Sequence, residues 1–457
     1  MLQNHTGFQT FPLSAAGGGD FPSLVQGSPT VFNLNTVPLY QGSMANYIPA
    51  LEVTITGNLV QAGGTGVRQP WDNLYRILVE SLELRNAWHG SPISPQNVKG
   101  AMMPLIEQFA CGYRNFARKR GFFPVANGTY PFSFTFPVPL SLGVGSKPHH
   151  TAQLAALYKE AQFSLQVAQA SVLTALSPGA TLTSLQVRCS AILLPDPEIR
   201  VGPVIEFIDY QVAATAGQVN VPIQSFGNNS QLTKMEKGAA LFYFGLLTSN
   251  GGLPGPFLPE NVTRLNVPWR GQTDTGHMVC YLTQQLLAMG NNRQIGGAAD
   301  QGSALALSDT GNFPYTPAFD GTTISEMAGL LAWPIVTPAA DLELTKIQTV
   351  DGDESLNVQL SSGPSGTWHN LAGQARSWQP GALQDLTQYL VNVGLPSKIL
   401  KGGSGGLTWM VKSLRKNDDI DAKKTRYLPL VLKRENKDKP FNPTTNPNSR
   451  RMKLKAA

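Results

Sequence analysis

Short segments in which apolar and polar residues alternate dominate the middle of the chain. In residues 51–57 the apolar Leu51, Val53 and Ile55 alternate with Glu52 and two threonines, which is the period of a β-strand with one buried face. Further segments read as strands at 132–136, 163–167, 185–189, 204–210, 219–223, 239–247, 262–267, 278–282, 342–347 and 355–360. The spacing predicts an all-β protein.

Two segments have the spacing of helices instead. Ser94 can cap a helix and Pro95 suits its first position. Apolar residues then recur every three or four positions as far as Gly121, which predicts a helical insertion at about 94–121. A second, short helix is expected to end at Gly394, which is followed closely by a proline.

The order of these segments predicts two domains. The chain has 457 residues, well beyond the roughly 250 to 300 at which one hydrophobic core stops growing. A proline-rich break near residues 194–197 separates two strand-rich halves. We expect an irregular N-terminal arm at 1–50, a first domain at 51–200, a second at 203–395, and a linker with a C-terminal tail at 396–457.

Composition supports this picture and adds a strong asymmetry of charge. The chain has 45 glycines and 34 prolines, and such abundance of turn formers favours many short elements. Charged residues make up 14%, against about 25% in an ordinary soluble protein. Residues 401–457 contain 15 basic and 5 acidic residues, whereas residues 1–400 contain 20 basic and 24 acidic ones. A cationic tail on a slightly acidic body suggests an anionic partner for the tail.

The tail itself divides into an apolar stripe and a basic segment. Positions i, i+3, i+4 and i+7 of a short helix are occupied by Leu407, Met410, Val411 and Leu414, an amphipathic anchor that can lie on an anionic membrane or dock on protein. The candidate genome- or membrane-facing residues are Lys412, Arg415, Lys416, Lys423, Lys424, Arg426, Lys433 and Arg434.

Candidate chemistry along the chain is weak, and we expect no enzyme, no cofactor and no metal site. The three cysteines are far apart, so neither a disulfide framework nor a zinc site is indicated. Ser404 lies in a G-x-S-x-G sequence, but without the strand and helix that a nucleophile elbow needs. The chain also lacks the features of a secretory signal or an apolar run long enough to span a bilayer.

The layout resembles a known family. Two strand-rich halves, a proline-rich crossover, an irregular arm and a basic tail are similar to the double jelly-roll major capsid proteins of tailless icosahedral viruses, such as tectivirus- and corticovirus-like phages. The likeness is strongest over residues 130–142, 161–195 and 204–247. It implies two consecutive jelly rolls with helical insertions and a basic C-terminal tail.

The resemblance also implies a function. Proteins of this family form pseudo-hexameric homotrimers that tile an icosahedral shell, so we expect a bacteriophage virion protein, made in the host cytoplasm. Its partners would be neighbouring capsomers, other virion proteins and, through the tail, genome or an internal membrane. Two alternatives are a minor or vertex virion protein and a carbohydrate-active or carbohydrate-binding β protein, for which the seven tryptophans could supply stacking platforms.

Overall fold

The described residues fold into packed β-sheets with only short helices, which confirms the all-β prediction. The computed structural model describes residues 9–63, 73–87, 91–103, 106, 126–141, 152–196, 204–215, 217–222, 239–248, 262–266, 330–334, 355–360, 366–376 and 389–395. The helical elements are α1 (Asn73–Leu78), η3 (Gly100–Met102), η6 (Ala155–Tyr158) and α3 (Ala170–Leu176), and residues 389–392 form a further helical turn. Among the described residues, no helix has the length and apolar character to cross a membrane.

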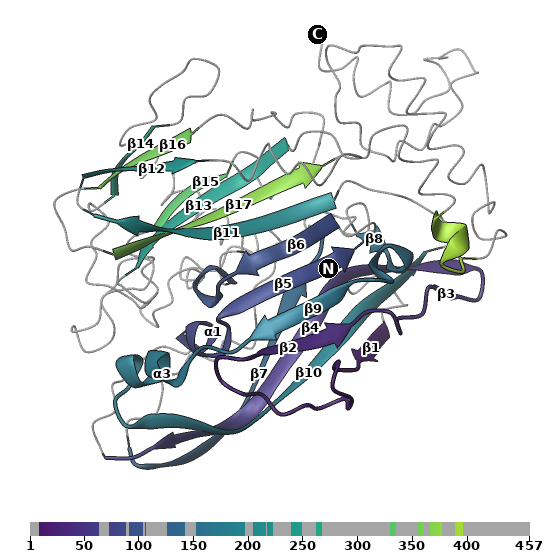
Figure 1. Ribbon diagram of the computed structural model, residues 1–457, viewed down its shortest axis with the longest axis horizontal. Coiled ribbons are helices and arrows are strands. Elements are labelled where there is room, and N and C mark those ends of the chain that lie inside the picture. The colour runs from purple at the N-terminus through teal and green to yellow at the C-terminus, as the bar shows by residue number, and fades with distance from the viewer. Residues whose placement is uncertain are drawn as a thin grey trace, which may run out of the picture.

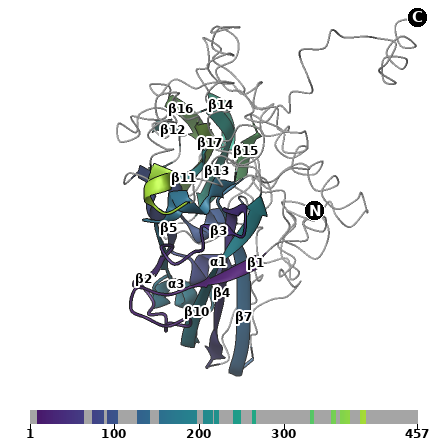
Figure 2. The same ribbon diagram turned by 90° about the vertical axis from the view of Figure 1, so that its right-hand side faces the viewer.

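Two antiparallel sheets form the first domain. One has the order β1 (Gln9–Leu13), β10 (Ala180–Asp196), β4 (Met44–Gln61) and β7 (Gly128–Pro139), with the two-residue strands β3 (Tyr40–Gln41) and β8 (Gln153–Leu154) beside β4. The other has the order β2 (Pro29–Asn33), β9 (Gln162–Gln166), β5 (Ser81–Ala87) and β6 (Ser91–Val98). Figure 2 shows β4, β7 and β10 running along the length of this domain.

The pairing of these strands is that of a jelly roll. Apart from β3 and β8, the first strand along the chain pairs with the last, the second with the second-last, and so on inwards: β1 with β10, β2 with β9, β4 with β7, and β5 with β6. This nested pairing folds a long hairpin over into two facing sheets, which is how a jelly roll is wound. The first domain is therefore a jelly roll, as the sequence predicts.

The second domain repeats the same winding. One sheet has the order β11 (Val204–Ala214), β17 (Gly366–Arg376), β13 (Ala239–Thr248) and β15 (Leu330–Pro334), and the other has β12 (Gly217–Pro222), β16 (Ser355–Leu360) and β14 (Val262–Asn266). Again the outermost strands of the segment pair, β11 with β17 and β12 with β16. The part of the chain between β14 and β15, where a jelly roll has one further strand, falls outside the described residues.

The two rolls stand side by side and share one continuous sheet (Figure 1). Its order is β15, β13, β17, β11, β6, β5, β9, β2. At its centre β6 of the first roll runs parallel to β11 of the second, with Gln96 opposite Ile208. We call this pairing, together with Lys99 and Asp209 beside it, the junction.

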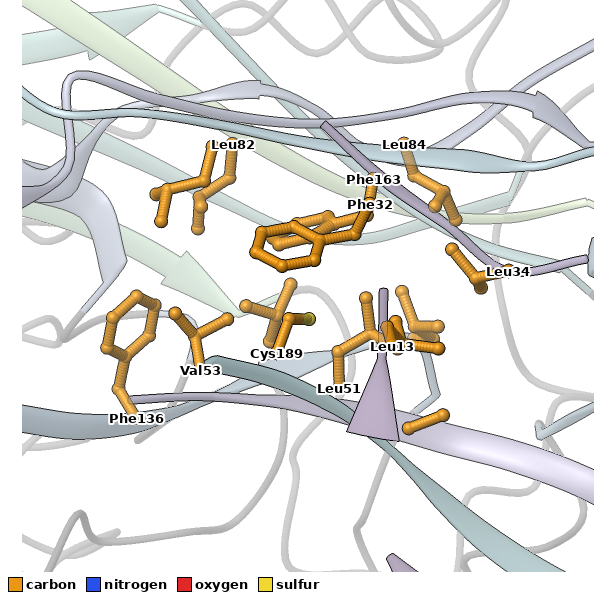
Figure 3. Close-up of a cluster of buried hydrophobic side chains, with 14 of the residues drawn as sticks. Leu13, Phe32, Leu34, Leu51, Val53, Leu82, Leu84, Phe136, Phe163 and Cys189 are labelled. Atoms are coloured by element: carbon orange, nitrogen blue, oxygen red, sulfur yellow. The ribbon is translucent and has the colours of Figure 1, made fainter. Parts of the chain in front are cut away.

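Apolar side chains from both sheets fill the first roll. Figure 3 shows Leu82, Leu84 and Phe163 on one side facing Val53 and Cys189 on the other. These side chains are fully buried, because alternate residues of each strand point to the same face. The ring of Phe163 is stacked on that of Phe32 with the centroids 6.4 Å apart. The alternation read from the sequence thus builds the core.

The expected irregular arm at 1–50 is wrong for residues 9–50, the part of it that the structure describes. Residues 9–13 and 29–33 are the strands β1 and β2, and β4 already begins at Met44. Residues 45–51 are all buried, so this part of β4 lacks the polar alternation that identifies a strand with one exposed face. The first two strands are short, and they are held by partners more than 100 residues away along the chain.

The expected helical insertion at about 94–121 is also wrong in its first part. Residues 91–98 form β6, and helical conformation begins only at Gly100, with η3 at Gly100–Met102 and the described residues Met103 and Ile106 after it. Pairing with β5 on one side and β11 on the other overrides the helical spacing, because tertiary context outweighs local propensity. The rest of this prediction, from residue 107, lies outside the described residues, as do the strands expected at 278–282 and 342–347.

Candidate functional site

The residues predicted to face genome or membrane lie outside the described residues. This holds for the amphipathic anchor at 407–414 and for the basic positions at 412–434. Their roles stay predictions. The described part of the chain instead offers three features that bear on function: the junction, a C-terminal turn that packs against the first roll, and the outer edges of that roll.

A buried carboxyl group lies at the junction. Asp209 of β11 is 2% exposed, and its Oδ2 accepts a hydrogen bond of 2.9 Å from the backbone N–H of Lys99, just after β6. Its Oδ1 has no hydrogen-bond partner among the described atoms. Burial raises the pKa of Asp209 to about 8, although the hydrogen bond and the positive charge of Lys99 act in the opposite direction. The carboxyl is therefore largely neutral near pH 7.

The surroundings of Asp209 explain this neutrality. Phe207 lies two positions before it on the same face of β11, and Leu371 of β17 lies directly opposite. Both belong to the buried apolar cluster that fills the first roll. The Nζ atom of Lys99 lies 3.7 Å from Oε1 of Glu80. The buried His369 lies close to Gln211, with 3.2 Å between His369 Nδ1 and Gln211 Nε2. An ionised Asp209 would lose its hydration in an apolar setting, which is unfavourable.

A helical turn at 389–395, the C-terminal turn, follows the second roll and packs on the first. Leu390 and Leu395 are buried in the same apolar cluster as the first-roll core. Leu395 N–H donates to Leu390 O at 2.9 Å, and Gly394 N–H donates to Val391 O at 3.0 Å. These two bonds, with Gly394 at φ +100°, form a Schellman cap. The predicted helix end at Gly394 is confirmed.

Among the described strands β7 pairs with β4 alone, which makes it an edge strand, and it is rich in proline. Leu140 N–H, just beyond β7, donates to Pro49 O, so the even-numbered positions of β7 hydrogen-bond to β4. Pro131, Pro137 and Pro139 occupy odd-numbered positions, whose N–H groups would point away from β4. Proline has no N–H and discourages the addition of another strand. Addition of another strand is therefore hindered at these three positions.

An exposed apolar pair lies beside β10. Phe21 is 54% exposed and Val25 63%, on a segment that pairs with β10 through Val187 N–H to Pro22 O and Leu24 N–H to Leu185 O. The guanidinium of Arg188 lies 5.5 Å from the centroid of the Phe21 ring. Nothing in the alternating pattern of the sequence identified this pair, since the segment has no regular period.

The described residues give no support to a carbohydrate site. Trp368, one of the candidate stacking platforms, is fully buried, and its indole N–H donates to Asn370 at 2.8 Å. No group of three or more His, Cys, Asp or Glu side chains in the described ranges could hold a metal ion. The thiol of Cys189 is buried, and burial raises its pKa further above the ordinary value, which keeps the thiol protonated. Ser404 lies outside the described residues.

Neither a protein-family model nor a curated protein matches the chain. Solved structures of viral capsid proteins do resemble it. A chain of Sulfolobus turreted icosahedral virus has 12% identity and a TM-score of 0.47, over 86% of this chain and 99% of its own length. The Faustovirus major capsid protein has 8% identity and a TM-score of 0.44, over 82% of this chain and 90% of its own length. The major capsid protein of bacteriophage PM2 has 8% identity and a TM-score of 0.36, over 82% of this chain and 98% of its own length.

Proposed function

We propose that the protein is a major capsid protein, which assembles as a homotrimer into the icosahedral shell of a tailless virus. The observation that supports this proposal best is the pair of jelly rolls, wound alike and standing side by side in one continuous sheet. This layout is that of the family which the sequence resembles. Nothing in the fold identifies the host, so a bacterial one stays a prediction.

The shape of one subunit supports the proposed trimer. Each subunit supplies two similar blocks, so three subunits around a closed three-fold axis supply six, and six blocks can tile a hexagonal lattice. A low content of charged residues, 14%, suits a protein whose lateral faces are covered by neighbours, because charges are depleted at the centres of interfaces. The proline-rich edge of β7 would let neighbouring subunits meet without uncontrolled strand addition.

We further propose that the tail faces the interior of the particle. Its excess of basic over acidic residues attracts phosphate, either of the genome or of an internal membrane. The eight candidate residues between Lys412 and Arg434 would make most of this contact. The apolar stripe of residues 407–414 would anchor the tail to lipid or to a neighbouring subunit.

The two alternatives are less well supported. A minor or vertex protein would not need two equal rolls, whereas both halves of this chain use the same winding. Of the seven tryptophans that could bind a sugar ring, Trp368 is the one whose side chain the structure describes, and it is buried in the second roll. We therefore favour a structural protein of the shell that is not an enzyme.

The test compares three proteins by sedimentation and electron microscopy: the full chain, a chain without residues 407–457, and a full-length variant with the eight basic residues changed to Gln. We expect trimers with a hexagonal outline from all three. Only the full chain should assemble into filled shells, because the other two lack most of the excess positive charge of the tail.

Monomers of the full chain at micromolar concentration would contradict the proposed trimer. Normal, filled particles from the truncated chain would contradict the role of the tail but leave the trimer intact. The Gln variant separates the contribution of charge from that of tail length.

A further inference from the structure

Within the described residues, β6 and β11 are the one pair of strands that joins the two rolls by hydrogen bonds. Asp209 lies beside this pairing and accepts a hydrogen bond from the first roll through Lys99 N–H, 2.9 Å from Oδ2. A side chain of the second roll thus holds the backbone of the first roll at the point where β6 ends.

The described charged and titratable groups around Asp209 are few and have other partners. Lys99 directs its ammonium group towards Glu80, at 3.7 Å. On β17, His369 is close to Gln211, with 3.2 Å between Gln211 Nε2 and its Nδ1. The Oδ1 atom of Asp209 has no hydrogen-bond partner in the described part of the chain. A negative charge at this position would be compensated by one backbone N–H and, more weakly, by the positive charge of Lys99.

We propose that Asp209 makes the junction sensitive to pH: the two rolls are held together while its carboxyl group is neutral, and its ionisation favours separation of β6 from β11. The physical reason is desolvation. A carboxylate with one unpaired oxygen among apolar side chains is strongly disfavoured, whereas separation of the strands would let water hydrate it. This property does not depend on the proposed role in a capsid.

The sign and the pH window follow from proton linkage. In the closed junction burial raises the pKa of Asp209 to about 8, whereas a hydrated Asp has a pKa of about 4. Between these values the closed form binds more protons than the open form, so raising the pH favours opening. The equilibrium constant for opening should rise on the order of tenfold per pH unit and level off above about pH 8.

Hydrogen exchange of the full chain can measure this opening at the Lys99 amide and along β6 and β11. We would compare wild type, Asp209→Asn and Asp20→Asn between about pH 6 and about pH 9.5, with intrinsic exchange rates divided out. The amide introduced by Asp209→Asn keeps an acceptor for Lys99 N–H but cannot ionise. Asp20 is an exposed carboxyl group that serves as the matched control.

Wild type and Asp20→Asn should show corrected exchange that rises on the order of tenfold per pH unit and levels off near pH 8. Asp209→Asn should show a flat profile and a higher midpoint of thermal unfolding than wild type at about pH 8.5. A flat profile in wild type, or a wild-type slope retained in Asp209→Asn, would overturn the proposal. If the Asp209→Asn variant does not fold, the wild-type profile still tests the proposal. A wild-type exchange rate that is flat with pH, or that rises without levelling off, cannot result from ionisation of Asp209.

Discussion

The two rolls have the same winding but differ in what they bury. The first roll has an apolar interior of leucine, valine and phenylalanine side chains contributed by both sheets (Figure 3). The polar side chains that it also buries, such as Asn46, Gln153 and Ser190, are neutral amides and hydroxyls, whereas strands β11 and β17 of the second roll bury the titratable Asp209 and His369. Nested pairing of strands therefore defines the fold, while the choice of buried residues can differ. Asp209 lies at the junction, and His369 lies on the neighbouring strand β17.

The largest effect should come from truncating a core side chain of the first roll. Phe163→Ala removes a fully buried ring stacked on Phe32, so the free energy of unfolding should fall by about 3–5 kcal/mol. Phe21→Ala, at an exposed phenylalanine, should change it by less than about 0.5 kcal/mol. Denaturant unfolding followed by circular dichroism gives both values. Equal losses would show that the first roll does not depend on this core.

A smaller loss is expected from adding a methyl group to the second roll. A Cβ atom at Gly245 would lie 2.0 Å from Cζ2 of the buried Trp368, and such overpacking costs about 1–3 kcal/mol. Gly17→Ala is the matched control, because a Cβ there has no atom within 4 Å. Thermal unfolding of both variants tests the difference. An unchanged midpoint in Gly245→Ala would mean that the indole ring moves without cost.

The C-terminal turn should be weakened by Gly394→Ala. Gly394 has φ +100° with open space around it, so the cost is backbone strain alone, roughly 1–2 kcal/mol. Val391→Ala, at a half-exposed position of the same turn, should have a smaller effect. Faster hydrogen exchange at Leu395, whose N–H closes the cap, is the expected result. Unchanged protection would argue against the Schellman cap as the element that ends this helix.

The smallest expected effect concerns the outward face of the first roll. The hydroxyl groups of Thr54 and Thr135 lie 2.9 Å apart on the neighbouring strands β4 and β7, and such cross-strand pairs contribute about 0.2–1 kcal/mol. A double-mutant cycle with Thr→Val at each position isolates this term. A coupling energy of zero would mean that the proline-rich edge strand is held by its backbone and buried face alone.

The candidate sites differ in how far the sequence could predict them. The basic tail is evident from composition, yet its role stays a prediction because it lies outside the described residues. Asp209 was missed, although one signal was available. It follows Ile205 and Phe207 at the spacing of one strand face, so the pattern places a carboxyl group on an apolar surface. Only the packing of the first roll against β11 shows that this surface is covered.

The sequence by itself determined that segments with a clear apolar–polar alternation become strands, and where the last described helix ends. Alternation placed Leu51, Val53 and Ile55 on a buried face, and Gly394 ended the helical turn, since both signals depend on neighbours within a few residues. Tertiary structure alone decided that Gln9 pairs with Leu193, that residues 91–98 form a strand instead of a helix, and that β6 meets β11. These outcomes depend on contacts between residues far apart in the chain, whose free energy outweighs local preference.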